Sequence, residues 1–273
     1  MQQPEFTTLS LTLADQIAEV RLNRPDKSNA INEAMWQEIR QAFEWIDATP
    51  EARVVILSGA GKNFCAGIDL AMLAGVQQRI AHADGARSRE ALRRLILDLQ
   101  DCLSSLERCA KPVIAAIQGA CVGGALDLVT CCDLRYASAD ATFSVKEIDI
   151  GMVADVGTLQ RLPRLIGEGQ ARELAYTGRT LNGQEAEKLG LANRLFATPA
   201  ELEAGVRQIA RSIAAKAPLA IRGTKEVLNY SRDHTIADGL NFVATWNAAT
   251  LLSSDLKECM QAQMEKRAPQ FAD

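Results

Sequence analysis

The sequence predicts an α/β fold of repeated strand–helix units, followed by a helical region at the C-terminal end. Two short, wholly apolar runs, Val54–Leu57 and Pro112–Ile117, are each followed by glycines, as is typical of buried parallel strands. Segments with apolar residues at helical spacing alternate with these runs. After Pro199 only the helical periodicity remains. We therefore expect a core domain over residues 1–198 and a helical oligomerisation region over residues 199–273.

The individual elements follow from local patterns. Polar and apolar residues alternate over 7–13 and over Ile17–Leu22, and Asp15-Gln16 between them predicts the turn of a hairpin. Apolar residues at helical spacing predict a helix over 30–48, with Asn29 as its N-cap. The remaining expected elements are a strand at 54–57, a helix at 86–109, strands at 112–117, 133–137 and 142–145, and C-terminal helices with breaks near Pro218 and Asp233-His234.

Composition narrows the classes of function. The 34 acids and 30 bases leave a net charge of −4, which does not provide the basic surface that nucleic-acid binding requires. The sequence has no apolar run of membrane-spanning length and no signal-peptide pattern at its start. The seven cysteines contain no CxxC pair, so we expect reduced, packed thiols and no metal site. These features predict a cytoplasmic protein that binds neither nucleic acid nor a membrane.

The scarcity of histidine points to carboxylates for acid–base chemistry near neutral pH. Only His82 and His234 are present, and neither lies in a context that suggests a catalytic base. Cys65 could serve as a nucleophile in principle. Without a partner histidine, however, we expect its side chain to pack in the interior.

Three acids stand in largely apolar stretches: Asp127, Glu147 and Asp155. Burying a carboxylate among apolar side chains is costly and raises its pKa, so such acids usually form ion pairs or take part in catalysis. The alternative to catalysis is that each acid caps a helix or pairs with a nearby base. The candidate bases are Arg135, Lys146 and Arg161.

Two glycine-rich loops, at residues 58–70 and 119–127, follow the two apolar strands. Small residues let a backbone approach a ligand closely, and a helix N-terminus presents free N–H groups. One N–H group from each loop could therefore stabilise a developing oxyanion. The simpler interpretation is that the glycines only terminate the strands.

Taken together, these features resemble the crotonase (enoyl-CoA hydratase/isomerase) superfamily over nearly the whole chain. Within it, the chain is most similar to the Δ3,5-Δ2,4-dienoyl-CoA isomerase subfamily, through residues 126–130, 145–151, 154–163 and 231–234. An acid at the position of Asp155 separates this subfamily from ordinary hydratases. The wider resemblance rests on Leu22–Pro25, Phe64–Leu70, Lys111–Ile117, Gly123-Gly124, Asp133–Arg135, Thr177-Gly178, Glu185-Ala186 and Gly190-Leu191.

The resemblance implies a spiral of ββα units and a helical trimerisation region, in a homotrimer or a homohexamer built as a dimer of trimers. It implies an acyl-CoA thioester as substrate and no separate cofactor or metal, because coenzyme A is part of the substrate. The backbone N–H groups of Ile68 and Gly124 match the oxyanion hole. The implied substrate-binding residues are Ala66, Gly67, Ile68, Asp69, Leu70 and Gly124, with Arg24, Lys27 and Ala30 toward the nucleotide end.

The resemblance also implies a reaction, the isomerisation of a 3,5-dienoyl-CoA to a 2,4-dienoyl-CoA in fatty-acid β-oxidation. Our hypothesis is that Glu147 transfers the proton at carbon 2, that Asp155 serves carbon 6, and that Asp127 tunes Glu147. The alternative is an enoyl-CoA hydratase, in which Asp127 and Glu147 position water. An RNA-binding relative is disfavoured by the net charge, and a structural pseudoenzyme by the presence of all three acids.

Overall fold

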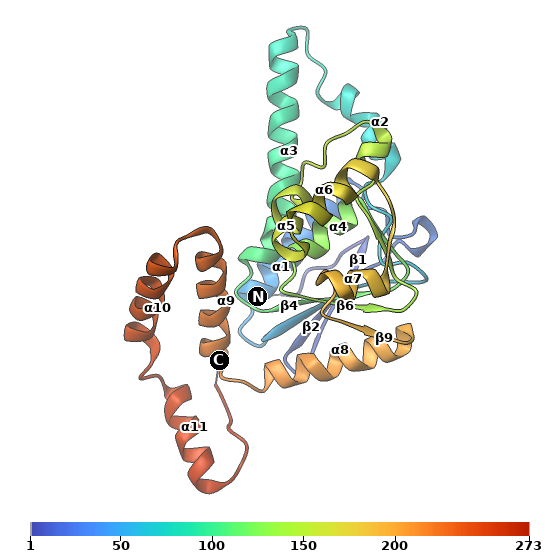
Figure 1. Cartoon of the computed structure of the whole chain (residues 1–273). Helices are drawn as coiled ribbons and strands as arrows, with labels where there is room; N and C mark the ends of the chain where they lie inside the picture. The colour runs from blue at the N-terminus through green and yellow to red at the C-terminus, as the bar shows by residue number, and fades with distance from the viewer. Residues whose placement is uncertain (1, 273) are drawn as a thin grey trace.

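A six-stranded sheet forms the centre of the molecule, and the computed structural model, which describes residues 2–272, confirms the α/β class (Figure 1). Its strand order is β1-β2-β3-β4-β6-β9, with β1 antiparallel to β2 and the other neighbours parallel. The strands are β1 (Leu9–Ala14), β2 (Ile17–Leu22), β3 (Val54–Gly59), β4 (Val113–Ile117), β6 (Leu134–Ser138) and β9 (Arg194–Phe196).

The predicted hairpin is confirmed. Ala14 pairs with Ile17 across a two-residue turn, in which Asp15 and Gln16 have φ values of 51° and 65°. Turns with two left-handed residues match the twist of the strands that they join, and short polar residues such as Asp tolerate this conformation.

Both faces of the sheet are buried, which explains the continuous apolar runs. Along β3, Val54 and Ile56 point toward helix α8 (Pro199–Ala214), whereas Val55 and Leu57 point into the larger core. That larger core is covered by α1 (Glu33–Ala48) and α3 (Gly85–Arg108). Helix α8 therefore packs on the sheet, although it begins the region of purely helical periodicity.

A second, three-stranded sheet lies beside the first and carries the second glycine-rich loop. It consists of β5 (Ala120–Val122), β7 (Thr142–Ser144) and β8 (Leu181–Asn182), with β7 in the middle. The associated helices are α4 (Gly124–Thr130), the 3₁₀ turn η2 (Glu147–Ile150), α5 (Thr158–Ile166), α6 (Glu168–Thr177) and α7 (Gly183–Leu189).

The C-terminal helices stand to one side of the body, whereas α2 (Leu70–Arg79) and the outer half of α3 extend above it (Figure 1). The expected breaks near Pro218 and Asp233-His234 are confirmed, and a further break at 251–253 was not predicted. Across residues 2–272, no helix combines the length and apolar content of a membrane span. The C-terminal helices are α9 (Pro218–Asp233), α10 (Ile236–Thr250) and α11 (Ser254–Glu265).

The predicted N-cap of the first helix is wrong. Helix α1 begins at Glu33, and the Asn32 side chain caps it by accepting a hydrogen bond from the Met35 amide. The preceding residues cannot join the helix, because Ile31 forms an isolated parallel bridge with Ile68. Asn29 instead adopts a φ of 55° and donates its side-chain amide to the carbonyls of Ala60, Asn63 and Phe64.

Candidate active site

The two glycine-rich loops lie side by side and form one wall of the candidate site. The Cys65 amide donates to the Ala120 carbonyl at 2.9 Å, and the Val122 amide donates to the Cys65 carbonyl at 3.2 Å. At the closest point, Gly67 has a φ of +89°, and a Cβ atom there would lie 2.5 Å from the Val122 carbonyl oxygen. Glycine is therefore required for the loops to approach each other this closely.

Two backbone N–H groups lie close together where these loops meet. Within the described residues, neither the Ile68 nor the Gly124 amide has a hydrogen-bond acceptor. A Cβ atom built on Gly124 would lie 3.6 Å from the Ile68 nitrogen, so the two residues are close neighbours. Because both line the same cavity, their amides are placed to bind one oxygen atom together.

The cavity has a volume of about 340 Å³ and lies between the loops and the helices α2 and α3. Five of the six substrate-binding residues predicted from the resemblance line it: Ala66, Gly67, Ile68, Leu70 and Gly124. The sixth, Asp69, is not among its lining residues. Its carboxylate caps α2 through the Ala71 amide.

The three residues expected at the nucleotide end lie away from the cavity lining. Arg24 pairs with Asp69 at 2.9 Å and also donates to the Ala30 carbonyl. Lys27 is exposed, and Ala30 is half-buried. The Arg24–Asp69 pair therefore links the end of the first glycine-rich loop, where α2 begins, to the segment that follows β2.

All three predicted acids line the cavity, and each comes from a different segment. Asp127 is in α4, Glu147 opens η2, and Asp155 lies in the loop before α5. Asp127 is completely buried, whereas Glu147 and Asp155 are half-buried. The fold thus brings together side chains that are up to 28 positions apart in the chain.

Burial governs the protonation of these acids. It raises the pKa of Asp127 to about 6, against the opposing effect of a 2.5 Å hydrogen bond from the Thr158 amide to Oδ1. Burial also raises the pKa of Glu147 to about 7, and the charges of Asp127 and Asp155 add to this shift. The pKa of Asp155 is raised by burial as well. The group can therefore exchange protons near neutral pH.

Two carboxylate oxygens are left without a partner. Oδ2 of Asp127 and Oε2 of Glu147 are buried and have no hydrogen bond in the part of the chain described. A Cβ atom on Gly123, whose φ is +55°, would lie 3.0 Å from Oε1 of Glu147. Buried polar atoms without partners are uncommon in folded proteins and are often associated with function.

The alternative of ion pairing with nearby bases is wrong for all three candidates. Lys146 pairs with Asp149 at 2.7 Å, and Arg161 pairs with Glu107 at 2.9 Å. Arg135 donates to backbone carbonyls. Over residues 2–272, the three acids of the cavity therefore have no ion-pair partner.

The other candidate groups are not part of the site. Burial raises the pKa of the Cys65 thiol to about 12, which makes it a poor nucleophile at neutral pH. His82 is exposed, and His234 stacks on Tyr230 at the end of α9 with a ring separation of 3.8 Å. These positions agree with the expectation that none of the three is catalytic.

The apolar walls of the cavity lie mainly within residues 71–100, the segment in which the sequence predicts the pocket walls, but their shape could not be predicted. Part of the signal was available, because four apolar residues of α3 repeat at helical spacing on a mostly polar helix. Their contribution to a cavity depends on how α2 lies against α3, which local patterns do not specify. These wall residues are Trp36, Met72, Leu73, Val76, Leu92, Leu95, Ile96 and Leu99.

Comparison with known proteins agrees with this geometry. A model of the enoyl-CoA hydratase/isomerase family matches residues 12–273. The chain is 50% identical to the peroxisomal Δ3,5-Δ2,4-dienoyl-CoA isomerase of Arabidopsis thaliana, over 92% of this chain and 91% of that protein. It is 44% identical to the mitochondrial Δ3,5-Δ2,4-dienoyl-CoA isomerase of Homo sapiens, over 96% and 80% respectively. The crystal structure of an enoyl-CoA hydratase from Bacillus anthracis matches with a TM-score of 0.88 and 33% identity, over 97% of this chain and 99% of that one.

These comparisons correct one expectation. The cytoplasmic location predicted from the sequence is contradicted, because the two relatives are named as peroxisomal and mitochondrial proteins.

Proposed function

The chain belongs to the enoyl-CoA hydratase/isomerase family, and on this basis we propose that it isomerises 3,5-dienoyl-CoA thioesters to 2,4-dienoyl-CoA thioesters. One observation of the site carries the proposal: three acids without ion-pair partners, one buried and two half-buried, share a cavity with two backbone amides that lack acceptors. The similarity to dienoyl-CoA isomerases at 38–50% identity favours this reaction over hydration.

The reaction removes a proton from carbon 2 and adds one to carbon 6. As the bond between carbon 2 and its hydrogen breaks, its electron pair enters the conjugated system and places negative charge on the thioester oxygen. The amides of Ile68 and Gly124 bind that oxygen. By comparison with other enzymes, each such donor lowers the barrier by roughly 3–4 kcal/mol. Protonation at carbon 6 then removes the negative charge from the thioester oxygen. Both double bonds end one carbon closer to the thioester.

In this proposal Glu147 is the base at carbon 2 and Asp155 is the acid at carbon 6. Both are half-buried at the cavity surface, where they can reach a bound substrate. Burial raises the pKa of Glu147 to about 7, so this group can accept and release a proton near neutral pH, and burial raises the pKa of Asp155 as well. Asp127 is buried behind them, where its charge raises the pKa of Glu147. Asp127 is therefore assigned a tuning role.

No separate cofactor is needed for these steps, because the coenzyme A thioester itself makes the carbon-2 proton acidic. The cavity walls on α2 and α3 are apolar and suit an acyl chain. Arg24, Lys27 and Ala30 remain the proposed contacts for the nucleotide end of coenzyme A.

We also propose that the protein assembles as a homotrimer or a homohexamer through the C-terminal region of residues 199–273, beyond α8, which packs on the sheet of the core. Large apolar side chains are exposed in this region, including Ile236 of α10 at 84% exposure and Leu252, in the turn before α11, at 86% exposure. Such apolar surfaces often mark subunit contacts. Light scattering after size-exclusion chromatography tests this: a mass of three or six chains is expected, and a monomer would contradict it.

An absorbance assay tests the proposed reaction. The 2,4-dienoyl product absorbs strongly in the near ultraviolet, so turnover of a 3,5-dienoyl-CoA is expected to raise the absorbance. Hydration of a 2-enoyl-CoA is the alternative reaction, and it would consume an absorbing substrate. Activity on the 2-enoyl thioester alone would overturn the proposal.

A further inference from the structure

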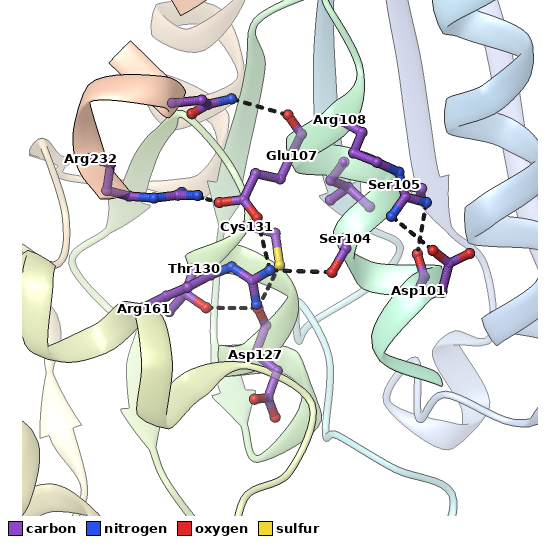
Figure 2. A network of polar contacts seen from close by, with 12 residues as sticks. Asp101, Ser104, Ser105, Glu107, Arg108, Asp127, Thr130, Cys131, Arg161 and Arg232 are labelled. Atoms are coloured by element: carbon purple, nitrogen blue, oxygen red, sulfur yellow. Dashed lines mark hydrogen bonds and ion pairs between the residues drawn. The ribbon is translucent and has the colours of Figure 1, made fainter. Parts of the chain in front are cut away.

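A cluster of charged side chains lies behind the buried acid Asp127 and joins three helices (Figure 2). Glu107 of α3 is at its centre. Arg161 of α5 donates to Glu107 at 2.9 Å and to the Ser104 hydroxyl at 3.3 Å. Arg232 of α9 donates to the other carboxylate oxygen of Glu107. The cluster thus links the C-terminal helices to the helix that begins beside the active site.

The pairing at the centre of this cluster is well shielded from solvent. The side chains of Arg161 and Glu107 are only 17% and 19% exposed. Burial opposes the ionisation of Glu107, but hydrogen bonds from Arg161 and Arg232 keep its pKa below the usual value. Charge-assisted hydrogen bonds in such surroundings hold a side chain in one position.

Arg161 lies one turn after the start of α5, where the helix contacts Asp127. The Thr158 amide of this first turn donates to Asp127 Oδ1 at 2.5 Å, and Oδ2 of that carboxylate has no hydrogen-bond partner within residues 2–272. The Arg161 guanidinium folds back over Gly157, where a Cβ atom would lie 1.9 Å from Nη1. Gly157 is the N-cap residue and has no side chain to cap the helix. The Arg161 side chain occupies the space that a side chain at Gly157 would enter.

We propose that Arg161 is a positioning residue for the isomerisation. Held by Glu107 and Ser104, it fixes the first turn of α5 so that the Thr158 amide stays on Asp127. Its positive charge also offsets part of the repulsion within the acid cluster. This inference rests on the proposed function, because it assigns Arg161 a role in that reaction.

Arg161 supplies the positive charge in the surroundings of Asp127. Figure 2 shows its side chain between Glu107 and Asp127. The mutual electrostatic effect of Arg161 and Asp127 is favourable, whereas Asp155 raises the pKa of Asp127. The other titratable groups that interact with Asp127 are Glu147 of η2 and the thiols of Cys121 in β5 and of Cys131, which follows α4; burial raises the pKa of each of these groups.

The test replaces Arg161 with methionine and follows the pH dependence of kcat/KM together with the carboxyl ¹³C NMR titration of labelled aspartate. Loss of the positive charge is expected to raise the pKa of Asp127, and to move the acidic limb of the kcat/KM profile to higher pH, by about 0.5–1 unit. This is at or below the smallest pKa shift that an adjacent opposite charge usually causes. We also expect kcat to fall more than KM changes. Arg161→Lys keeps the charge and is expected to restore most of the shift.

Arg164→Met is the matched control. Arg164 is also on α5 and pairs with α9 through Asp233 at 2.6 Å, but it does not interact with Asp127. We expect this variant to leave both titrations unchanged. An unshifted titration in Arg161→Met, or an equal shift in Arg164→Met, would overturn the inference.

The two readouts also separate this inference from the proposed function. If the native protein does not isomerise the dienoyl thioester, the proposed function fails, whereas the NMR titration still reports the effect of Arg161 on Asp127. If the native protein is active but Arg161→Met changes only the melting temperature, Arg161 has a structural role and the inference alone fails.

Discussion

Replacing Asp127 with asparagine is expected to stabilise the protein at neutral pH. The carboxyl is completely buried, and its pKa is about 6 in the folded state against an ordinary value of 3.8. Between these two values the folded state binds more protons than the unfolded state, so the stability that Asp127 contributes falls as the pH rises. A shift of about two units corresponds to roughly 3 kcal/mol of destabilisation above pH 6.

Asparagine does not ionise, so the variant lacks this pH-dependent destabilisation. Its carbonyl can still accept the hydrogen bond from Thr158, whereas its NH₂ group would occupy the place of Oδ2, which has no partner. An unsatisfied NH₂ group costs about 1–3 kcal/mol at every pH, so the net gain at pH 7.5 is expected to be about 1–2 kcal/mol at most.

Urea unfolding at pH 4 and at pH 7.5 measures the effect. The unfolding free energy of the variant relative to the native protein is expected to rise by roughly 2–3 kcal/mol from the lower to the higher pH, because the constant cost of the amide cancels. A difference that does not depend on pH, or that changes in the opposite direction, would refute the assignment of a buried carboxyl with a raised pKa.

Two further predictions concern the site, and a third concerns the buried thiol of Cys65. In D₂O, Glu147→Gln is expected to abolish hydrogen exchange at carbon 2 of the bound thioester, whereas Asp155→Asn retains it; the opposite pattern would reverse the two roles. Gly67→Ala would place a methyl group 2.5 Å from the Val122 carbonyl oxygen and force the two loops apart, so kcat is expected to fall by about 10²–10³, as on loss of one oxyanion donor, and an unchanged kcat would exclude this oxyanion site. Iodoacetamide at pH 8 is expected to leave Cys65 unmodified in the folded protein, because its thiol pKa is about 12; peptide mass spectrometry would reveal a modified Cys65.

Much of the fold was predictable because its strands carry an unambiguous burial pattern. Val54 and Val55 face opposite sides of the sheet and are both buried, so the run between them and Leu57 is apolar throughout. The cap at Asn29 failed because a contact between distant segments, the bridge of Ile31 with Ile68, delays the start of α1. Local spacing does not contain that information.

The candidate site was likewise predictable only where local sequence patterns decide the structure. The acids were identifiable because each of them lies in a largely apolar stretch of the sequence. The partner of Arg161 could not be identified from the sequence, because Glu107 lies 54 positions earlier in the chain, on another helix. Asp69 lies between two lining residues in the sequence, but this position did not reveal where its side chain points. Its carboxylate contacts Arg24 and the start of α2 instead.

In the proposed reaction, the three acids and the two amides catalyse the transposition of two double bonds. The most direct measurement compares the initial rates of the native protein on a 3,5-dienoyl-CoA and a 2-enoyl-CoA of equal chain length, with Asp155→Asn alongside. We predict formation of the near-ultraviolet absorbing 2,4-dienoyl product by the native protein and its loss in the variant. Rapid hydration of the 2-enoyl-CoA without dienoyl isomerisation, unaffected by the substitution, would contradict the claim.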